Sequence, residues 1–181
     1  MANTEIIVER LETYTEEDAK NLGLLRNALS SDRSSSRLRE DRIRKFVDQP
    51  DRLLVAARAA ETGRIIGGET LVTIPILEAN DDEVDGIAWL GFVSTLPKYR
   101  GQGIVKRVTL EGLRWCVEQE LEDIKFTSNS HNPERDNARA FYLKYGAVIV
   151  AKGVGPKDTD FFNWNVKVGL DVLTADNPSS G

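Results

Sequence analysis

The amino-acid sequence predicts a mixed α/β fold, with a twisted, mostly antiparallel sheet of about seven strands and helices on both faces. An apolar strand at residues 87–93 leads through a glycine-containing loop into a helix from Ile104, and a new strand begins at Asp123. This strand–helix–strand connection implies at least one parallel pair of strands. The hairpin connections before it imply antiparallel pairing. No internal repeat or obvious linker interrupts the chain.

Each element is recognised from apolar periodicity and from the residues that bound it. Thr15 and Asp18 form a capping box that predicts the start of the first helix. Asn132 and Pro133 suit the first positions of a later helix, which Gly146 ends. Strands are expected at residues 6–8, 53–59, 65–77, 87–93, 123–127, 147–151 and 161–168, and the other two helices at 38–47 and from Ile104. That last helix has two apolar rows, formed by Ile104, Val108, Gly112 and Trp115 and by Leu110, Leu113, Val117 and Leu121.

Composition places the chain among globular proteins and excludes several classes. Its 181 residues suit one domain, expected at 1–173, followed by a loose tail at 174–181. The net charge of −5 argues against nucleic acid as the main partner. No apolar run approaches the roughly 18 residues that span a bilayer, and no signal peptide is evident. The single Cys116 fits a reducing, cytoplasmic setting and a buried structural role.

The loop before the helix from Ile104 has the features of an anion site. Gly101 and Gly103 let the backbone approach a ligand closely, because no Cβ stands in the way. The first N–H groups of a helix have no partner within the helix, and the helix dipole favours negative charge there. Lys98 and Arg100 add positive charge at the same place. No Cys/His cluster has the spacing of a metal site, so no metal is expected.

The same loop also carries a recognisable motif. The chain reads Val93-Ser94-Thr95-Leu96-Pro97 and then Arg100-Gly101-Gln102-Gly103-Ile104-Val105. This resembles the acyl-CoA-binding signature of the GNAT superfamily of N-acetyltransferases, V-x-V-x-P followed by Gln or Arg-x-x-Gly-x-Gly or Ala. Thr95 replaces the second Val of that signature, and Val105 replaces the final small residue. The branched Val105 crowds the start of the helix and is expected to weaken or shift the pyrophosphate seat.

A second segment, at residues 132–147, resembles the other GNAT signature, N-x-x-A-x-x-[LF]-Y-x-x-x-G-F. Ala138, Phe141, Tyr142 and Gly146 fall on its Ala, Leu or Phe, Tyr and Gly. Two departures are that Arg135 falls on its Asn and Ala147 on its final aromatic. Asn132, Arg135 and Asn137 are the candidates for the cofactor contact of that Asn. Two motifs in the right order make the resemblance much stronger than either alone, and the element order is similar to the GNAT fold.

The resemblance implies acetyl-CoA as the cofactor and transfer of its acetyl group to a primary amine by direct attack in a ternary complex. The N–H groups of Gln102, Gly103, Ile104 and Val105 would hold the pyrophosphate. The backbone of Val93 and Thr95, on either side of Ser94, would pair with the pantetheine arm. Tyr142 would protonate the departing thiolate. Without the motif, the position of Tyr142 on the apolar stripe of its helix would indicate an ordinary aromatic residue of the core.

The general base is harder to identify, because residues 86–97 contain no Asp or Glu. Glu69 on the preceding strand is the main candidate, although a solvent-facing strand residue is the plainer interpretation. Asp85, acting through water, and His131 are lesser candidates. A further alternative is that the acceptor arrives already deprotonated.

The acceptor is not identified by the sequence. Five acidic residues lie between positions 78 and 85, in a predicted hairpin loop. They would attract a cationic amine such as a polyamine, an aminoglycoside or a peptide amine, or they form a solubilising loop tip. Monomer and homodimer are both compatible with the sequence. The competing hypothesis is a non-catalytic CoA-binding or interaction module that retains the fold.

Overall fold

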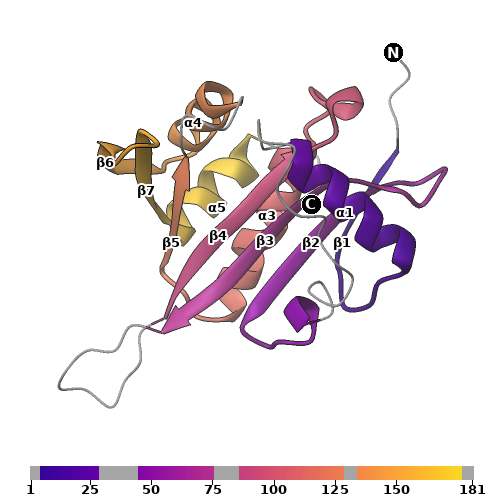
Figure 1. Ribbon diagram of the computed structural model, residues 1–181. Helices are drawn as coiled ribbons and strands as arrows, with labels where there is room; N and C mark the ends of the chain where they lie inside the picture. Colours follow the sequence, from indigo (N-terminus) through magenta and orange to yellow (C-terminus); the bar gives the residue numbers. More distant parts are fainter. Residues whose placement is uncertain (1–4, 29–44, 76–85, 129–133, 177–181) are drawn as a thin grey trace. The chain divides into compact units, whose positions relative to one another are not determined.

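The computed structural model describes residues 5–28, 45–75, 86–128 and 134–176. Within these residues seven strands form a sheet in the order β1-β2-β3-β4-β5-β7-β6 (Figure 1). The strands are β1 (Ile6–Arg10), β2 (Arg52–Ala59), β3 (Ile65–Pro75), β4 (Gly86–Thr95), β5 (Asp123–Ser128), β6 (Val148–Val154) and β7 (Thr159–Asn165). The helices are α1 (Glu16–Ala28), the 3-10 turn η1 (Pro97–Tyr99), α3 (Ile104–Glu118), α4 (Arg135–Lys144) and α5 (Val166–Ala175).

The pairing of the strands confirms the predicted mixed sheet. β1 pairs with β2, β5 with β7, and β6 with β7, all in antiparallel register. β4 and β5, the strands on either side of α3 in the chain, are parallel, with Ala88 opposite Ile124 and Trp89 opposite Lys125. The strand–helix–strand unit therefore supplies the parallel pair that the sequence predicted.

The chain divides into two compact units. The first consists of Met1–Leu71 with Gly91–Gly112, and the second of Val72–Leu90 with Leu113–Gly181. The predicted glycine loop belongs to the first unit and Tyr142 to the second. No helix among the described residues is both long and apolar enough to cross a membrane.

Helices cover both faces of the strands in the first unit, because two adjacent glycines of β3 let them approach. A Cβ on Gly68 would lie 3.7 Å from Leu25 Cδ1 of α1, whereas one on Gly67 would clash with Ile104 of α3. Neighbouring strand residues face opposite sides of a sheet. Figure 1 accordingly shows α1 in front of β2 and β3, and α3 behind β3.

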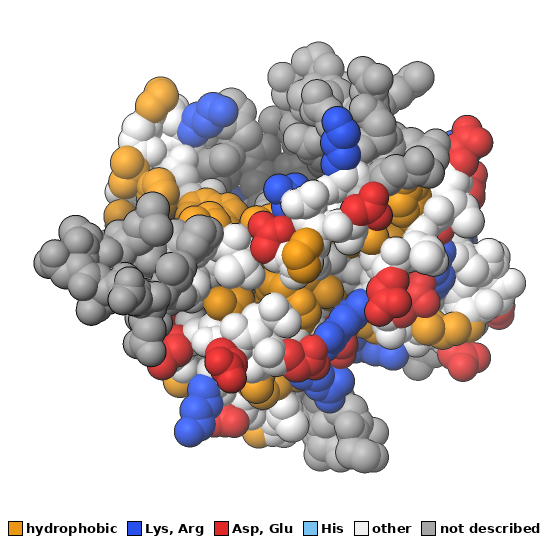
Figure 2. All heavy atoms as spheres, turned by 90° about the horizontal axis from the view of Figure 1, so that it is seen from below, with side chains coloured by type: hydrophobic (Ala, Val, Ile, Leu, Met, Phe, Trp, Pro, Cys, Tyr) orange, Lys and Arg blue, Asp and Glu red, His pale blue; other side chains and the backbone are white. Residues whose placement is uncertain are grey.

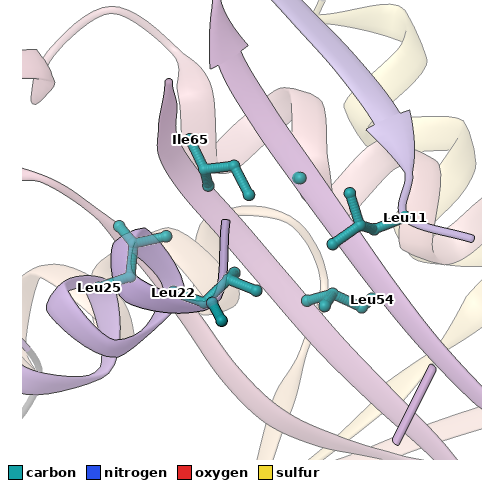
Figure 3. Close-up of a cluster of buried hydrophobic side chains, with 7 residues drawn as sticks. Leu11, Leu22, Leu25, Leu54 and Ile65 are labelled. Atoms are coloured by element: carbon teal, nitrogen blue, oxygen red, sulfur yellow. The ribbon is translucent and has the colours of Figure 1, made fainter. Parts of the chain in front are cut away.

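The core under α1 is made of aliphatic side chains. Leu22 and Leu25 of α1 pack with Leu54 of β2 and Ile65 of β3 (Figure 3). The predicted capping box starts this helix: Thr15 N donates to Asp18 Oδ2 at 3.0 Å, and Asp18 N donates to Thr15 Oγ1 at 3.2 Å. These two bonds satisfy N–H groups that the first turn of a helix leaves without partners.

The core of the second unit is aromatic. Phe126 of β5 stacks on Phe162 of β7, with ring centroids 4.7 Å apart, and also packs against Tyr142 of α4 at 4.4 Å. Trp164 of β7 meets Tyr142 edge-on and donates its Nε1–H to the carbonyl oxygen of Tyr145 at 2.8 Å. Such ring pairs add directional contacts to the area they bury.

Several element boundaries differ from the prediction. The expected strand 161–168 ends at Asn165, where helix α5 begins, with the Asn165 side chain accepting a bond from Val168 N at 3.1 Å. The helix continues to Ala175, two residues into the segment predicted as a loose tail. Helix α4 begins at Arg135, with Glu134 as its N-cap. Val117, assigned to an apolar row, is 50% exposed. Of the helix expected at 38–47, only 45–47 fall in the described residues, and these are helical.

Gly169 provides a test of α5. An ordinary helix gains about 1 kcal/mol when Gly is replaced by Ala, but a Cβ here would lie 2.7 Å from Trp164 Cε2. We expect Gly169→Ala to lower the free energy of unfolding by about 1–3 kcal/mol, as overpacking does. Urea denaturation measures it, with the exposed Asp171→Ala as the control. A stabilised Gly169→Ala variant would contradict the packing of α5 on Trp164.

Candidate functional site

The glycine loop joins η1 to α3 in the first unit. Gly101 and Gly103 have φ values of 78° and 72°, a region that residues with a Cβ rarely adopt. Apart from the adjacent residues, no atom of the described residues lies within 4 Å of the place where a Cβ would stand on either glycine. The loop is fixed at both ends, by Tyr99 N donating to Leu96 O at 2.9 Å and by Arg107 N donating to Gly103 O at 3.1 Å. The backbone is thus ordered but open on its outer side.

The electrostatic character of the loop is positive. Lys98 and Arg100 precede the two glycines, and Lys106 and Arg107 follow in the first turn of α3. No acidic residue occurs between positions 94 and 110. Together with the N–H groups of the first helical turn, these charges favour an anionic ligand such as a phosphate. The sequence analysis missed Lys106 and Arg107, although their spacing from Ile104 would have placed them in that turn.

The end of β4 presents backbone groups away from β3. Leu96 N donates to Ile66 O of β3 at 2.8 Å, and Phe92 N donates to Thr70 Oγ1 at 3.1 Å. Polar backbone groups of successive strand residues point to opposite sides. The N–H and C=O groups of Val93 and Thr95 therefore point to the side away from β3, as the added-strand hypothesis requires.

The side chains around this backbone serve mainly to pack the first unit. Ser94 Oγ donates to Leu25 O at 3.1 Å and so holds the end of α1. Ile104 is buried against Gly67, and Val105 is half-buried. Gln102 Oε1 and Thr95 Oγ1 are buried atoms with no hydrogen-bond partner in the described part of the chain.

Glu69 is enclosed between β3 and α3. It is 1% exposed, so the interpretation as a solvent-facing strand residue is wrong. Its carboxyl group lies against α3, where a Cβ on Gly112 would be 2.5 Å from Glu69 Oε1. Burial raises the pKa of Glu69 to about 8 from an ordinary 4.5, and the nearby hydroxyl of Thr109 opposes the rise. Neither Glu69 Oε2 nor Thr109 Oγ1 completes a hydrogen bond of ordinary geometry with the described residues.

Thr109 and Gly112 were not predicted from the sequence to be neighbours of Glu69. One signal was present in the sequence: a glycine in the middle of a helix is unfavourable by about 1 kcal/mol relative to Ala and so usually has a packing reason. The partner that provides this reason lies on β3, more than 40 positions earlier in the chain, and only the fold brings the two together.

Tyr142 lies in the aromatic core of the second unit. The residue is 7% exposed, and its ring is surrounded by Phe126, Phe141 and Trp164. Gly146, with a φ of 92°, follows the C-cap residue Tyr145 and ends helix α4 as predicted. The ring contacts fix the orientation of the Tyr142 phenol within this unit.

The candidates for a cofactor contact on α4 have protein partners. Arg135 Nη1 lies 2.6 Å from Asp158 Oδ2, and Arg135 Nη2 lies 3.1 Å from Asp160 Oδ2. Asn137 Nδ2 donates to Glu134 Oε2 at 2.7 Å. Asn132, His131, Asp85 and the acidic loop 78–85 lie outside the described residues.

The chain belongs to the acetyltransferase (GNAT) family, whose sequence model matches residues 13–147. A comparison with curated proteins gave no match. The fold is similar to that of Arabidopsis thaliana NAA60 in complex with a bisubstrate analogue (TM-score 0.68, 16% identity, covering 89% of this chain and 98% of that one). It is also similar to the NatC complex bound to Gag peptide and CoA (TM-score 0.64, 18% identity, covering 88% of this chain and 96% of that one). A third similar structure is the aminoglycoside 6'-N-acetyltransferase AAC(6')-Ih from Acinetobacter baumannii (TM-score 0.57, 16% identity, covering 77% of this chain and 88% of that one).

The burial of Glu69 predicts a specific pH dependence of stability. Between the unfolded pKa of 4.5 and the folded pKa of about 8, the folded protein holds a proton that the unfolded chain has lost. Stability therefore falls as the pH rises through this window, by at most about 1.4 kcal/mol per pH unit. Glu69→Gln cannot titrate and should lack this component. Urea denaturation of both proteins from pH 5 to 9 measures the difference, and parallel profiles would refute it.

Proposed function

We propose that this protein is an acetyl-CoA-dependent N-acetyltransferase that transfers an acetyl group to a primary amine by direct attack in a ternary complex. The observation that carries the proposal is the glycine loop at the start of α3. Its two positive-φ glycines leave the backbone open, and four basic residues surround it. Membership of the family supports the activity. The similar NAA60 structure with acetyl-CoA and the NatC structure with CoA support the cofactor.

The loop fits the pyrophosphate of CoA by its chemistry. The N–H groups of Gln102, Gly103, Ile104 and Val105 would hold the phosphate oxygens, with Lys98 and Arg100 adding charge. The outward-pointing backbone of Val93 and Thr95 would hydrogen-bond the pantetheine amides in the manner of an added strand. Acetyl-CoA supplies, when bound, a thioester whose acyl carbon the amine can attack.

Tyr142 is our proposed general acid for the departing thiolate. An ordinary tyrosine has a pKa near 10, so its hydroxyl is protonated at neutral pH and can donate. The surrounding rings would hold the phenol in one orientation, which supports a positioned donor. The assignment to catalysis rests on the match between α4 and the family motif.

We propose that the acceptor amine arrives already deprotonated. A general base must come within hydrogen-bond reach of the proton that it removes. Glu69, the main candidate from the sequence, is enclosed between β3 and α3, which argues against that contact. Its raised pKa also means that most of it is protonated at neutral pH.

The acceptor is proposed only as a primary amine, on a peptide or on a small molecule. The similar structures include both kinds of enzyme, one bound to a peptide and one acting on aminoglycosides. On the face shown in Figure 2, acidic and basic side chains are intermixed among the described residues. This face therefore gives no reason to prefer a strongly charged acceptor.

Calorimetric titration with acetyl-CoA tests the cofactor site. We expect micromolar binding by the natural protein and at least a hundredfold weaker binding by Gly103→Glu, because the new carboxylate repels the phosphates. Gly155→Glu is a matched control: Gly155 also has a φ of 72° and nothing within 4 Å of a Cβ, but it lies in the second unit. Equal binding of acetyl-CoA by all three proteins would show that the cofactor does not bind at the glycine loop.

Replacement of Tyr142 by Phe tests the chemical step. Loss of a general acid should lower kcat about a hundredfold, while the dissociation constant for acetyl-CoA stays nearly unchanged. Tyr145→Phe, at the C-cap of the same helix, is the control; the Tyr145 hydroxyl donates to Asp176 Oδ2 at 2.6 Å and has no proposed part in catalysis. Turnover is measured by thiol release with a panel of peptide amines and polyamines. Unchanged kcat in Tyr142→Phe would remove the assigned acid role and leave the phenol a core residue.

A further inference from the structure

Glu69 is a buried ionisable group that the proposed chemistry does not use. It stands in the middle of β3, and its side chain meets α3 at Thr109 and Gly112. Among the described residues, its pKa is raised by burial and lowered in part by the Thr109 hydroxyl, with no contribution from a charged side chain. Burying a carboxyl without a full set of hydrogen bonds is unfavourable. A residue kept in such a place needs another explanation.

The glycine at position 112 shows that α3 is shaped around this carboxyl. A Cβ at this position would lie 2.5 Å from Glu69 Oε1 and 2.9 Å from Leu71 Cδ1. Gly112 lies inside the helix, where glycine is unfavourable by about 1 kcal/mol relative to Ala. Because glycine has no Cβ, the helix backbone can lie directly against the carboxyl group of Glu69.

The contacts between β3 and α3 run along one side of the helix. Ile104 packs on Gly67 at the start of α3, and Thr109 and Gly112 follow beside Glu69. Thr109 is only five residues after Ile104, about 7.5 Å along the helix. A helix is rigid over this length, so a shift at Glu69 would move the first turn and the glycine loop attached to it.

We propose that Glu69 is a positioning residue for the cofactor: its buried carboxyl group holds α3 against β3 and thereby sets the position of the glycine loop. The inference rests on the proposed function of that loop. It assigns to Glu69 a part in cofactor binding rather than in proton removal. Because the group acts in its protonated form, the neutral amide of glutamine can replace it. A smaller side chain leaves a void between β3 and α3, and the helix is then no longer held in its position on the strand.

Calorimetric titration with acetyl-CoA at pH 7, at a temperature where all the variants are folded, tests the proposal. We expect Glu69→Gln to bind within twofold of the natural protein and Glu69→Ala to bind about tenfold more weakly. Gly112→Ala, which pushes the carboxyl aside from the helix, should also bind about tenfold more weakly. It keeps the test decisive if Glu69→Ala does not fold.

Leu71→Ala separates positioning from a general loss of stability. Leu71 is fully buried, and its Cδ1 lies 2.9 Å from where a Cβ on Gly112 would stand, at the end of the contact farther from the loop. This variant should lose comparable stability in thermal unfolding and yet bind acetyl-CoA within about threefold of the natural protein. Weakening as large as that of Glu69→Ala would mean that loosened packing alone explains the effect.

Two further results would overturn the inference. Natural affinity in both Glu69→Ala and Gly112→Ala would show that this contact does not set the loop. Normal affinity but a hundredfold loss of kcat in Glu69→Gln, assayed with the amine panel, would make Glu69 the general base. If the natural protein itself fails to bind acetyl-CoA, the proposed function falls as well, whereas the outcomes above leave it standing.

Discussion

The seating of α3 on β3 is the contact on which the rest of the first unit depends. Gly67 and Gly112 remove side chains from the strand and the helix at two points, which allows Ile104 and Glu69 to fill the space between them. The features proposed to bind phosphate all lie at the N-terminal end of this helix. Their geometry is therefore only as well defined as the packing behind them, since a loop with open glycines has little stiffness of its own.

The two faces of β3 carry different tasks. On one side, Gly68 receives α1 through Leu25, and Ser94 of the neighbouring β4 donates its Oγ hydrogen to Leu25 O. On the other, Gly67 and Glu69 receive α3. A strand presents alternate residues to opposite faces, so a single short segment of β3 fixes both helices. This explains why the segment combines adjacent glycines with a buried carboxyl, an unusual composition for the interior of a strand.

The second unit uses a different means of holding its proposed catalytic side chain. Tyr142 is one of several aromatic residues in mutual contact, and Trp164 Nε1–H donates a hydrogen bond to the carbonyl oxygen of Tyr145, the C-cap residue of α4. A ring in such a cluster has few rotamers open to it. The interpretations of Tyr142 as core residue and as acid are thus compatible, because the packing that buries the ring would also orient the hydroxyl group.

Local signals in the sequence were sufficient for much of the fold. The Thr15–Asp18 capping box, the strand–loop–helix at 87–118 and the C-terminal glycine of α4 were all predicted from neighbouring residues, and the structure confirms them. The prediction failed at α5, whose first residues, 166–168, were assigned to the strand expected at 161–168. It failed again at Val117, which the helical row alone placed inside. In both cases the tertiary environment, not the local pattern, determined the outcome.

The sequence by itself determined the family and the position of the glycine loop, because both depend on residues a few positions apart whose backbone requirements are local. Only the tertiary structure determined the surroundings of Glu69. Its neighbours Thr109 and Gly112 come from another element, and whether a carboxyl is charged in water or neutral in a dry contact depends on the atoms around it rather than on adjacent residues. The sequence placed Glu69 on a strand, and the fold decided which side of that strand it faces and what lies against it.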